Sequence, residues 1–198
     1  MSKSFSKQWT LTTLGEVAEV LDPHPSHRAP KELTCGILFL GIGDFSESGE
    51  IIATNPRKVS HEVYKEHQKN YQFKEGLLGF CRVATVGKVV EFRDSYSEEI
   101  TISPTMAIVK PLNIDKLFLL YCLRSDLLRE QLNILTHGST RQSLGIKTLR
   151  ELYVPLPPLP EQKKIAKILS NFEKLIHQLN LQKIAQTNIY HALIADFF

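Results

Sequence analysis

The stretch Val154-Pro-Leu-Pro-Pro-Leu-Pro-Glu-Gln162 decides how this chain is organised. Four of the six residues from Pro155 to Pro160 are proline, which fixes φ and pushes each preceding residue toward extended geometry. Residues 155–160 are therefore predicted to form a stiff, polyproline-like strap. Pro160 suits the first turn of a helix, and Glu161 suits the positive end of the helix dipole. The strap is expected to fix the direction in which a helix leaves a globular body.

The region after the strap is predicted to be one long helix. No glycine or proline follows Pro160, and the span from Glu161 to Ala192 would measure about 48 Å at about 1.5 Å per residue. Five apolar residues recur three and four apart, the rhythm of a coiled coil: Ile165, Ile168, Phe172, Leu175 and Leu179. From Gln182 the rhythm weakens. The helix either folds back on its own domain or pairs with a partner helix, and its length favours pairing.

Residues 1–154 are predicted to form one mixed α+β domain. A chain of 198 residues with 42% hydrophobic content can bury one good core. Short helices are expected after the caps Thr13 and Ser60, and a longer helix from Asn113 to about Leu135. Strands are expected over Gly36–Ile42, Phe80–Phe92 with a bend at Gly87, Met106–Val109 and Glu151–Val154, with a helical turn over Ile146–Arg150.

Cysteine usage and hydropathy indicate a soluble protein of a reducing compartment. Cys35, Cys81 and Cys122 are far apart, and each sits in an apolar neighbourhood, so buried free thiols are expected. No apolar stretch is long enough to cross a bilayer, and no membrane contact is expected. We therefore expect a cytoplasmic protein.

The sequence lacks several common catalytic motifs. It contains no nucleotide-binding loop of the GxxxxGK[ST] kind and no glycine-rich turn for S-adenosylmethionine. The neighbouring acids Asp94, Glu98 and Glu99 lack the lysine pattern of a nuclease, and His24 and His27 lack further metal ligands. The chain is thus predicted to be non-catalytic, with no cofactor or metal of its own, although a nuclease with an unrecognised site remains an alternative.

Binding to double-stranded DNA is the activity that the polar residues favour. From His137 to Arg150 the chain carries basic residues and no acid. The loop between Gly138 and Gly145 offers hydroxyl, guanidinium and amide groups that can read base edges: Ser139, Thr140, Arg141, Gln142 and Ser143. Arg82, Thr85 and Lys88, which lie beside Gly87, are the next candidates for DNA contacts. Lys147 and Arg150 suit contacts to phosphate rather than to bases. The alternative is an ordinary polar connection and strand surface.

Several of these segments resemble one family. The loop Gly138-Ser-Thr-Arg-Gln-Ser143, the strap and Glu161-Gln-Lys-Lys-Ile-Ala166 look like the junction between a target-recognition domain and a spacer helix. That junction occurs in the DNA specificity subunits of type I restriction–modification systems. The opening Trp9-x-Leu11-x-x-Leu14-Gly-Glu-Val17 and the segment Arg82-x-x-Thr85-x-Gly87-Lys88 are similar to the recognition domains of that family.

The resemblance implies partners as well as a fold. It implies a recognition domain at 1–154, the strap at 155–160 and a spacer or dimerisation helix at 161–198. Methyltransferase and restriction/translocase subunits would supply catalysis and would hold S-adenosylmethionine and ATP. Members usually carry two recognition domains and two antiparallel spacer helices, so this chain resembles either a half-subunit that forms a homodimer on a palindromic, bipartite site or a truncated product. A stand-alone DNA-binding or assembly protein is the other reading.

Overall fold

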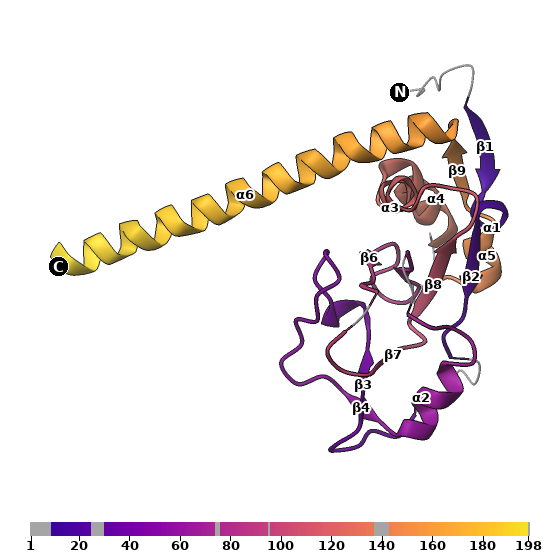
Figure 1. The fold of residues 1–198 in the computed structure, drawn as a ribbon, viewed down its shortest axis with the longest axis horizontal. Helices are drawn as coiled ribbons and strands as arrows, with labels where there is room; N and C mark the ends of the chain where they lie inside the picture. Colours follow the sequence, from indigo (N-terminus) through magenta and orange to yellow (C-terminus); the bar gives the residue numbers. More distant parts are fainter. Residues whose placement is uncertain (1–8, 25–29, 74–75, 95, 137–142, 198) are drawn as a thin grey trace.

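The computed structural model describes residues 9–24, 30–73, 76–94, 96–136 and 143–197. It consists of an α+β body and one long helix, α6 (Leu159–Phe197), which runs away from the body so that its C-terminal end lies far from every other element (Figure 1). The predicted fold class is confirmed. The 39 residues of α6 span about 58 Å at about 1.5 Å per residue, and the helix begins two residues before the predicted start at Glu161.

A four-stranded antiparallel sheet forms the centre of the body. Its order is β2 (Ala18–Leu21), β8 (Met106–Pro111), β5 (Leu78–Cys81) and β6 (Val89–Glu91). Both faces of this sheet are buried. Along β8, Ala107 and Val109 pack into one core, while the alternate residues Met106 and Ile108 pack into a second core on the opposite face. The central sheet thus joins two layers of the body.

The first core lies under the helices. It collects side chains from α1 (Leu14–Val17), α3 (Lys116–Leu123), α4 (Asp126–Thr136) and α5 (Ile146–Arg150), and it ends at Ala166 of α6. The cap of α1 follows the sequence prediction, because Glu16 accepts a hydrogen bond from the backbone N–H of Thr13 at 2.9 Å. The first turns of α6 pack against this core.

The second core lies between the central sheet and a smaller three-stranded sheet. That sheet has the order β4 (Lys58–Val59), β3 (Ile37–Leu40) and β7 (Ile100–Ile102), with β3 and β7 parallel. A 3₁₀ turn, η1 (Ile42–Asp44), follows β3, and α2 (His61–His67) lies beside β7 with Ser60 as its N-cap, as predicted. Gly79 of β5 permits this packing, since a Cβ there would lie 2.5 Å from Met106 Cε.

The helix predicted from Asn113 to Leu135 is two helices. Its first part is capped by Asp115 rather than Asn113, since the Asp115 carboxylate accepts from the N–H of Phe118 at 3.0 Å. The chain then breaks at Arg124 and Ser125, where the Ser125 hydroxyl donates to the Cys122 carbonyl at 2.7 Å. The hydroxyl competes with the helical backbone bonds and allows α4 to start in a new direction.

The proline strap is shorter than predicted. β9 (Tyr153–Leu156) pairs antiparallel with β1 (Thr10–Thr13) and so continues through Pro155, while α6 already begins at Leu159. Proline is tolerated in β9 because this two-stranded sheet leaves the outer edge of the strand unpaired. Only Pro157 and Pro158 therefore separate the last strand from the helix.

The structure also bears on the predictions about the cysteines and about the membrane. Cys81 and Cys122 are buried, and burial raises the pKa of the Cys122 thiol to about 12, whereas Cys35 is exposed, which corrects the prediction of three buried thiols. Within the described residues, no helix has the length and apolar character that crossing a membrane requires.

Candidate nucleic-acid interface

Two of the predicted DNA-binding segments lie side by side. Val83 and Ser143 form an isolated antiparallel bridge, and the backbone N–H of Leu144 donates to the carbonyl of Arg82 at 2.8 Å. This contact joins the β5–β6 turn to the end of the polar loop, although the two are about 60 residues apart in sequence. Ser143 is exposed there. The predicted base-reading residues Ser139, Thr140, Arg141 and Gln142 lie outside the described residues.

Arg82 serves the interior of the body rather than its surface. Its side chain is 11% exposed, and its guanidinium forms an ion pair with Asp22 at 3.2 Å. The same group donates to the carbonyls of Pro104 at 2.9 Å and Leu144 at 3.4 Å. Arg82 therefore holds the N-terminal part of the chain, the β7–β8 turn and the end of the polar loop together, and it is poorly placed to reach a base.

Thr85 and Lys88 occupy the exposed turn between β5 and β6. The turn closes through the N–H of Gly87, which donates to the Cys81 carbonyl at 3.1 Å, and Gly87 has a φ of +94° that favours glycine. Ala84 also has a positive φ, of 65°, which strains a residue with a Cβ. Strain of this kind is concentrated at functional sites, so the geometry favours a role for this turn beyond connecting two strands.

A basic hollow lies between this turn and α4. It has a volume of about 340 Å³, and its polar lining comes from the turn, the α3–α4 break and α4: Thr85, Lys88, Arg124, Ser125, Arg129 and Asn133. Arg129 is paired with Asp126 at 2.7 Å, and Arg124 is paired with Glu173 at 2.8 Å. Lys88 is exposed in this lining. The arrangement can accept an anionic group such as a backbone phosphate.

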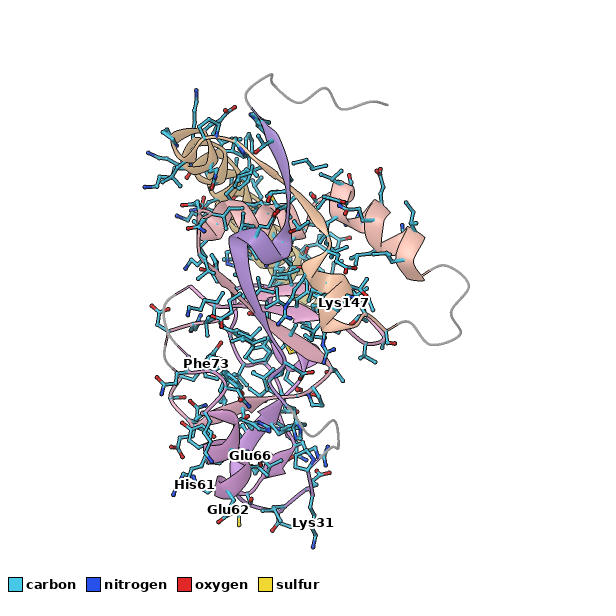
Figure 2. The ribbon with its side chains drawn as sticks, turned by 90° about the vertical axis from the view of Figure 1, so that its right-hand side faces the viewer. Lys31, His61, Glu62, Glu66, Phe73 and Lys147 are labelled. Carbon is cyan, nitrogen blue, oxygen red and sulfur yellow. The ribbon has the colours of Figure 1, made fainter. Side chains whose placement is uncertain are left out.

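Lys147 and Arg150 lie on α5, which follows the polar loop directly. Lys147 lies near the middle of the face drawn in Figure 2, whereas Lys31 and His61 lie at its lower end. Arg150 is partly committed, because its guanidinium donates to the carbonyl of Val20 at 2.6 Å and so fixes α5 against β2. Lys147 is therefore the freer of the two for a phosphate contact.

The predicted pairing residues of α6 fall into two groups. Ile165 is partly buried and packs against the first core, because α6 lies on α3 at this level. The other four remain on the surface with exposures of 46% to 59%: Ile168, Phe172, Leu175 and Leu179. Ile165 thus belongs to the attachment of the helix, and the exposed seam begins at Ile168.

The attachment of α6 uses residues that sequence reasoning missed. Gln162 is 3% exposed; its amide oxygen accepts from the N–H of Asp115 at 2.8 Å, and its amide nitrogen donates to the carbonyl of Pro157 at 2.8 Å. Three turns later, Glu173 accepts from Tyr121 and from Arg124, each at 2.8 Å. Burial and this bond to Glu173 raise the pKa of Tyr121 to about 12. In the sequence, Gln162 stood out only by its position directly after the strap, which does not reveal that it attaches α6 to the body.

A buried polar cluster marks the second layer of the body. His67 and Thr101 are hydrogen-bonded at 2.5 Å, Tyr71 bonds the same hydroxyl at 2.9 Å, and the His24 ring lies 4.5 Å from the His67 ring. Burial lowers the pKa of His67 to about 4 and raises that of Tyr71 to about 12. Among the described residues, no three His, Cys, Asp or Glu side chains are grouped to hold a metal ion.

Comparison with known proteins gives one consistent result. Residues 6–187 match the family model described as the type I restriction modification DNA specificity domain. The chain is 22% identical to the EcoBI specificity subunit of Escherichia coli over 97% of its own length, and 40% identical to the MjaVIII specificity subunit of Methanocaldococcus jannaschii over 41% of its length.

Two solved structures have folds similar to that of this chain. The crystal structure of the HsdS subunit from Thermoanaerobacter tengcongensis matches with a TM-score of 0.59 and 20% identity, over 90% of this chain and 40% of that one. A structure described as the basis of complex assembly and conformational transition of the type I R-M system matches with a TM-score of 0.62 and 20% identity, over 90% of this chain and 41% of that one. The chain spans 41% of the EcoBI subunit's length. It belongs to the family of the type I restriction modification DNA specificity domain.

Proposed function

We propose that this chain is the non-catalytic DNA-recognition component of a type I restriction–modification complex. Two copies would pair through α6, each body would read one half of a bipartite site, and identical bodies would make that site palindromic. Partner methyltransferase and restriction subunits would carry out modification and cleavage, and S-adenosylmethionine and ATP would bind to those partners.

The observation that carries the DNA-binding part is the bridge between Val83 and Ser143. It makes one continuous surface of the strained β5–β6 turn, the end of the polar loop and α5. Lys88 and Lys147 are exposed on this surface, and neither forms an ion pair with a described residue. Phosphate contacts from such lysines position a protein on the duplex, while the hydroxyl and amide groups beside them can address bases.

The observation that supports pairing is the exposed seam of α6. From Asn171 to Phe197 every side chain that the structure describes is exposed, and many of these side chains are large and apolar. Contiguous apolar surface of this kind marks an interaction site. A rod of about 58 Å between two bodies would separate the two arms of the site by more than one turn of B-DNA, about 34 Å.

The experiment that tests the function is a map of methylated bases in cells that carry this chain together with a methyltransferase subunit of a type I system. We expect one gapped palindromic motif to be modified, and to lose modification when this chain is deleted. Co-purification of the methyltransferase subunit should accompany it. Binding to DNA without any methyltransferase partner would instead support a stand-alone DNA-binding or assembly protein, and a motif with two unrelated arms would exclude the homodimer.

Single substitutions sharpen this test. Lys147→Ala should weaken binding to all DNA sequences alike and reduce the salt dependence by about one phosphate contact, because lysine on α5 is expected to meet the backbone. Lys163→Ala, an exposed lysine on α6, is the matched control and should leave binding to a single body unchanged. A change of the recognised sequence by Lys147→Ala would show that this lysine contacts a base.

A further inference from the structure

The basic hollow between the β5–β6 turn and α4 is built by both elements. The turn packs closely on α4, because a Cβ at Gly87 would lie 2.7 Å from Leu132 Cδ1, and the φ of +94° at Gly87 also favours glycine. The break between α3 and α4 adds Leu123, Arg124 and Ser125 to the lining. Segments that are distant in sequence thus enclose one cavity of about 340 Å³.

One face of α4 presents a row of polar side chains to this hollow. Arg129 and Asn133 lie four residues apart on the helix, and Ser125, directly before the helix, continues the row. Lys88 lines the hollow from the turn. Lys88, Arg129 and Asn133 are all exposed, and each can donate hydrogen bonds. The hollow therefore offers donors from two sides.

The charge of the lining is positive. Lys88, Arg124 and Arg129 contribute to it, and among the residues that the structure describes no acidic side chain does. Arg124 is committed to Glu173 and to two backbone carbonyls, which it reaches at 3.0 and 3.3 Å. Arg129 is paired with Asp126, but both side chains are more than two-thirds exposed, and ion pairs of this kind are weak. Lys88 and Arg129 are thus the cations that a ligand can engage.

We propose that this hollow binds one phosphate of the DNA backbone, with Lys88 and Arg129 as its charged contacts and Asn133 as a neutral one. A guanidinium group matches the oxygens of a phosphate in a bidentate manner, and an ammonium group adds a second charge. The inference rests on the proposed DNA-recognition function. It adds a contact site on α4, which no sequence pattern indicated, and assigns Lys88 to a phosphate rather than to a base.

The position of the hollow favours DNA over a free anion as the source of the phosphate. The turn that borders it is joined to the end of the polar loop through the Val83–Ser143 bridge. Ala84 and Thr85 lie between this bridge and the hollow and are both exposed, and Ala84 has a positive φ of 65°. A backbone phosphate in the hollow would bring the strand past Thr85, whose hydroxyl can address base edges.

Binding of the full chain to a short duplex of arbitrary sequence tests the inference, because a phosphate contact does not depend on the recognised bases. At low salt, Arg129→Ala and Lys88→Ala should each weaken binding about tenfold, as expected for a hydrogen bond between charged groups. Arg93→Ala is the matched control, since it removes an exposed arginine from the ion pair with Glu50, and it should leave binding unchanged.

A double-mutant cycle shows whether the two cations meet at one phosphate. The losses in Lys88→Ala with Arg129→Ala should depart from the product of the single losses by at least about threefold, because groups that share a partner are coupled. Arg129→Ala with Lys147→Ala joins two separate contacts, and its losses should multiply to within about a factor of two. Multiplicative losses in the first pair would overturn the shared site.

A further variant should strengthen binding, which a folding defect cannot imitate. Asp126→Asn releases Arg129 from its ion pair, so affinity for the duplex should rise about two- to fivefold. Glu130→Gln is the matched control, because Glu130 is an exposed acid of α4 that does not line the hollow, and its effect should be smaller. Equal gains in the two variants would assign the change to net charge and contradict the contact by Arg129.

The remaining outcomes separate the inference from the proposed function. If the wild-type chain binds the duplex and both alanine variants bind equally well, the inference alone is overturned. If the wild-type chain binds no duplex at low salt, with or without a methyltransferase subunit, both are overturned. The side-chain NMR signal of Arg129 should shift when the duplex is added. A shift with millimolar inorganic phosphate but none with the duplex would assign the hollow to a free anion and overturn the DNA contact.

Discussion

Between Gln162 and Glu173 α6 is held to the body by three kinds of contact, whereas beyond Glu173 all its described side chains are exposed. Gln162 bonds two backbone groups, Ala166 lies in the first core and Glu173 receives two donors from α3. The exposed part has a regular apolar pattern instead. One helix therefore combines a segment that is specific for its own body with a segment whose pattern fits another helix.

The largest effect is expected from a charge in the exposed seam. Leu175→Asp should weaken pairing of two copies roughly a thousandfold, about 4 kcal/mol, because a carboxylate would be desolvated between helices. Light scattering over a dilution series should show the mass falling from twice 22.5 kDa, while thermal unfolding of the body stays unchanged. Asn180→Asp adds the same charge off the seam and should remain paired. If Leu175→Asp stayed dimeric, the interface would lie outside the seam.

Acidic pH should lower the stability of the body but not the pairing of the exposed part of α6. His67 has its pKa lowered to about 4 in the folded body, so the unfolded chain binds the proton more readily between about pH 6.5 and 4. The stability that neutral His67 contributes is complete above about pH 6.5 and declines as the pH falls toward 4, by roughly 3 kcal/mol at about 1.4 kcal/mol per unit of pKa shift.

Urea unfolding at several pH values, followed by tyrosine fluorescence, measures this decline. His67→Gln keeps a group that can bond Thr101 and should flatten the difference between pH 6.5 and 4.5. An equal decline in the wild-type chain and in His67→Gln would assign it to carboxylates instead.

A smaller effect is expected at the attachment of α6. Gln162→Leu leaves the N–H of Asp115 and the carbonyl of Pro157 without their side-chain partner, and should cost about 2 kcal/mol of stability. Urea unfolding of the body measures it, with Lys163→Leu at the adjacent exposed position as the control. No loss relative to that control would mean that the backbone groups find other partners.

The smallest effect is expected at Glu173. Glu173→Gln removes the charge that pairs with Arg124, and because this carboxylate is half exposed the cost should stay below about 1 kcal/mol. The pKa of Tyr121 should fall, since the bond to the carboxylate contributes to raising it. Ultraviolet titration of the tyrosines, compared with Tyr121→Phe, separates this group from the others. An unchanged tyrosine titration would contradict the contact.

Much of the fold could be predicted because its signals are local. The caps at Thr13 and Ser60, the turn at Gly87 and the helix after the prolines all depend on residues within a few positions of one another. The break at Ser125 could not be predicted, because a run of good helix formers surrounds it and the Arg124 side chain is oriented by Glu173 from a distant helix.

The candidate site was predictable in outline and less so in detail. Residue types indicated the two polar segments, and the Val83–Ser143 bridge brings them together. The role of Arg82 depends on Asp22, which is 60 residues away, so the sequence offered no sign that this arginine would be taken up in the interior. Ile165 matched the seam pattern but packs on its own body, since the rhythm does not reveal where the helix leaves it.

The attachment at Gln162 has a consequence for angular precision. The exposed part of α6 is a lever arm of about 40 Å, so a tilt of about five degrees at its base moves its tip by about 3.4 Å, the rise of one base pair. In the proposed pair of copies, distinguishing gaps that differ by a single base pair would require this angle to be held more tightly than that. The amide of Gln162, buried and bonded at both ends, and the bonds from Arg124 and Tyr121 to Glu173 restrict tilting at the base of α6, as the proposed pairing would require.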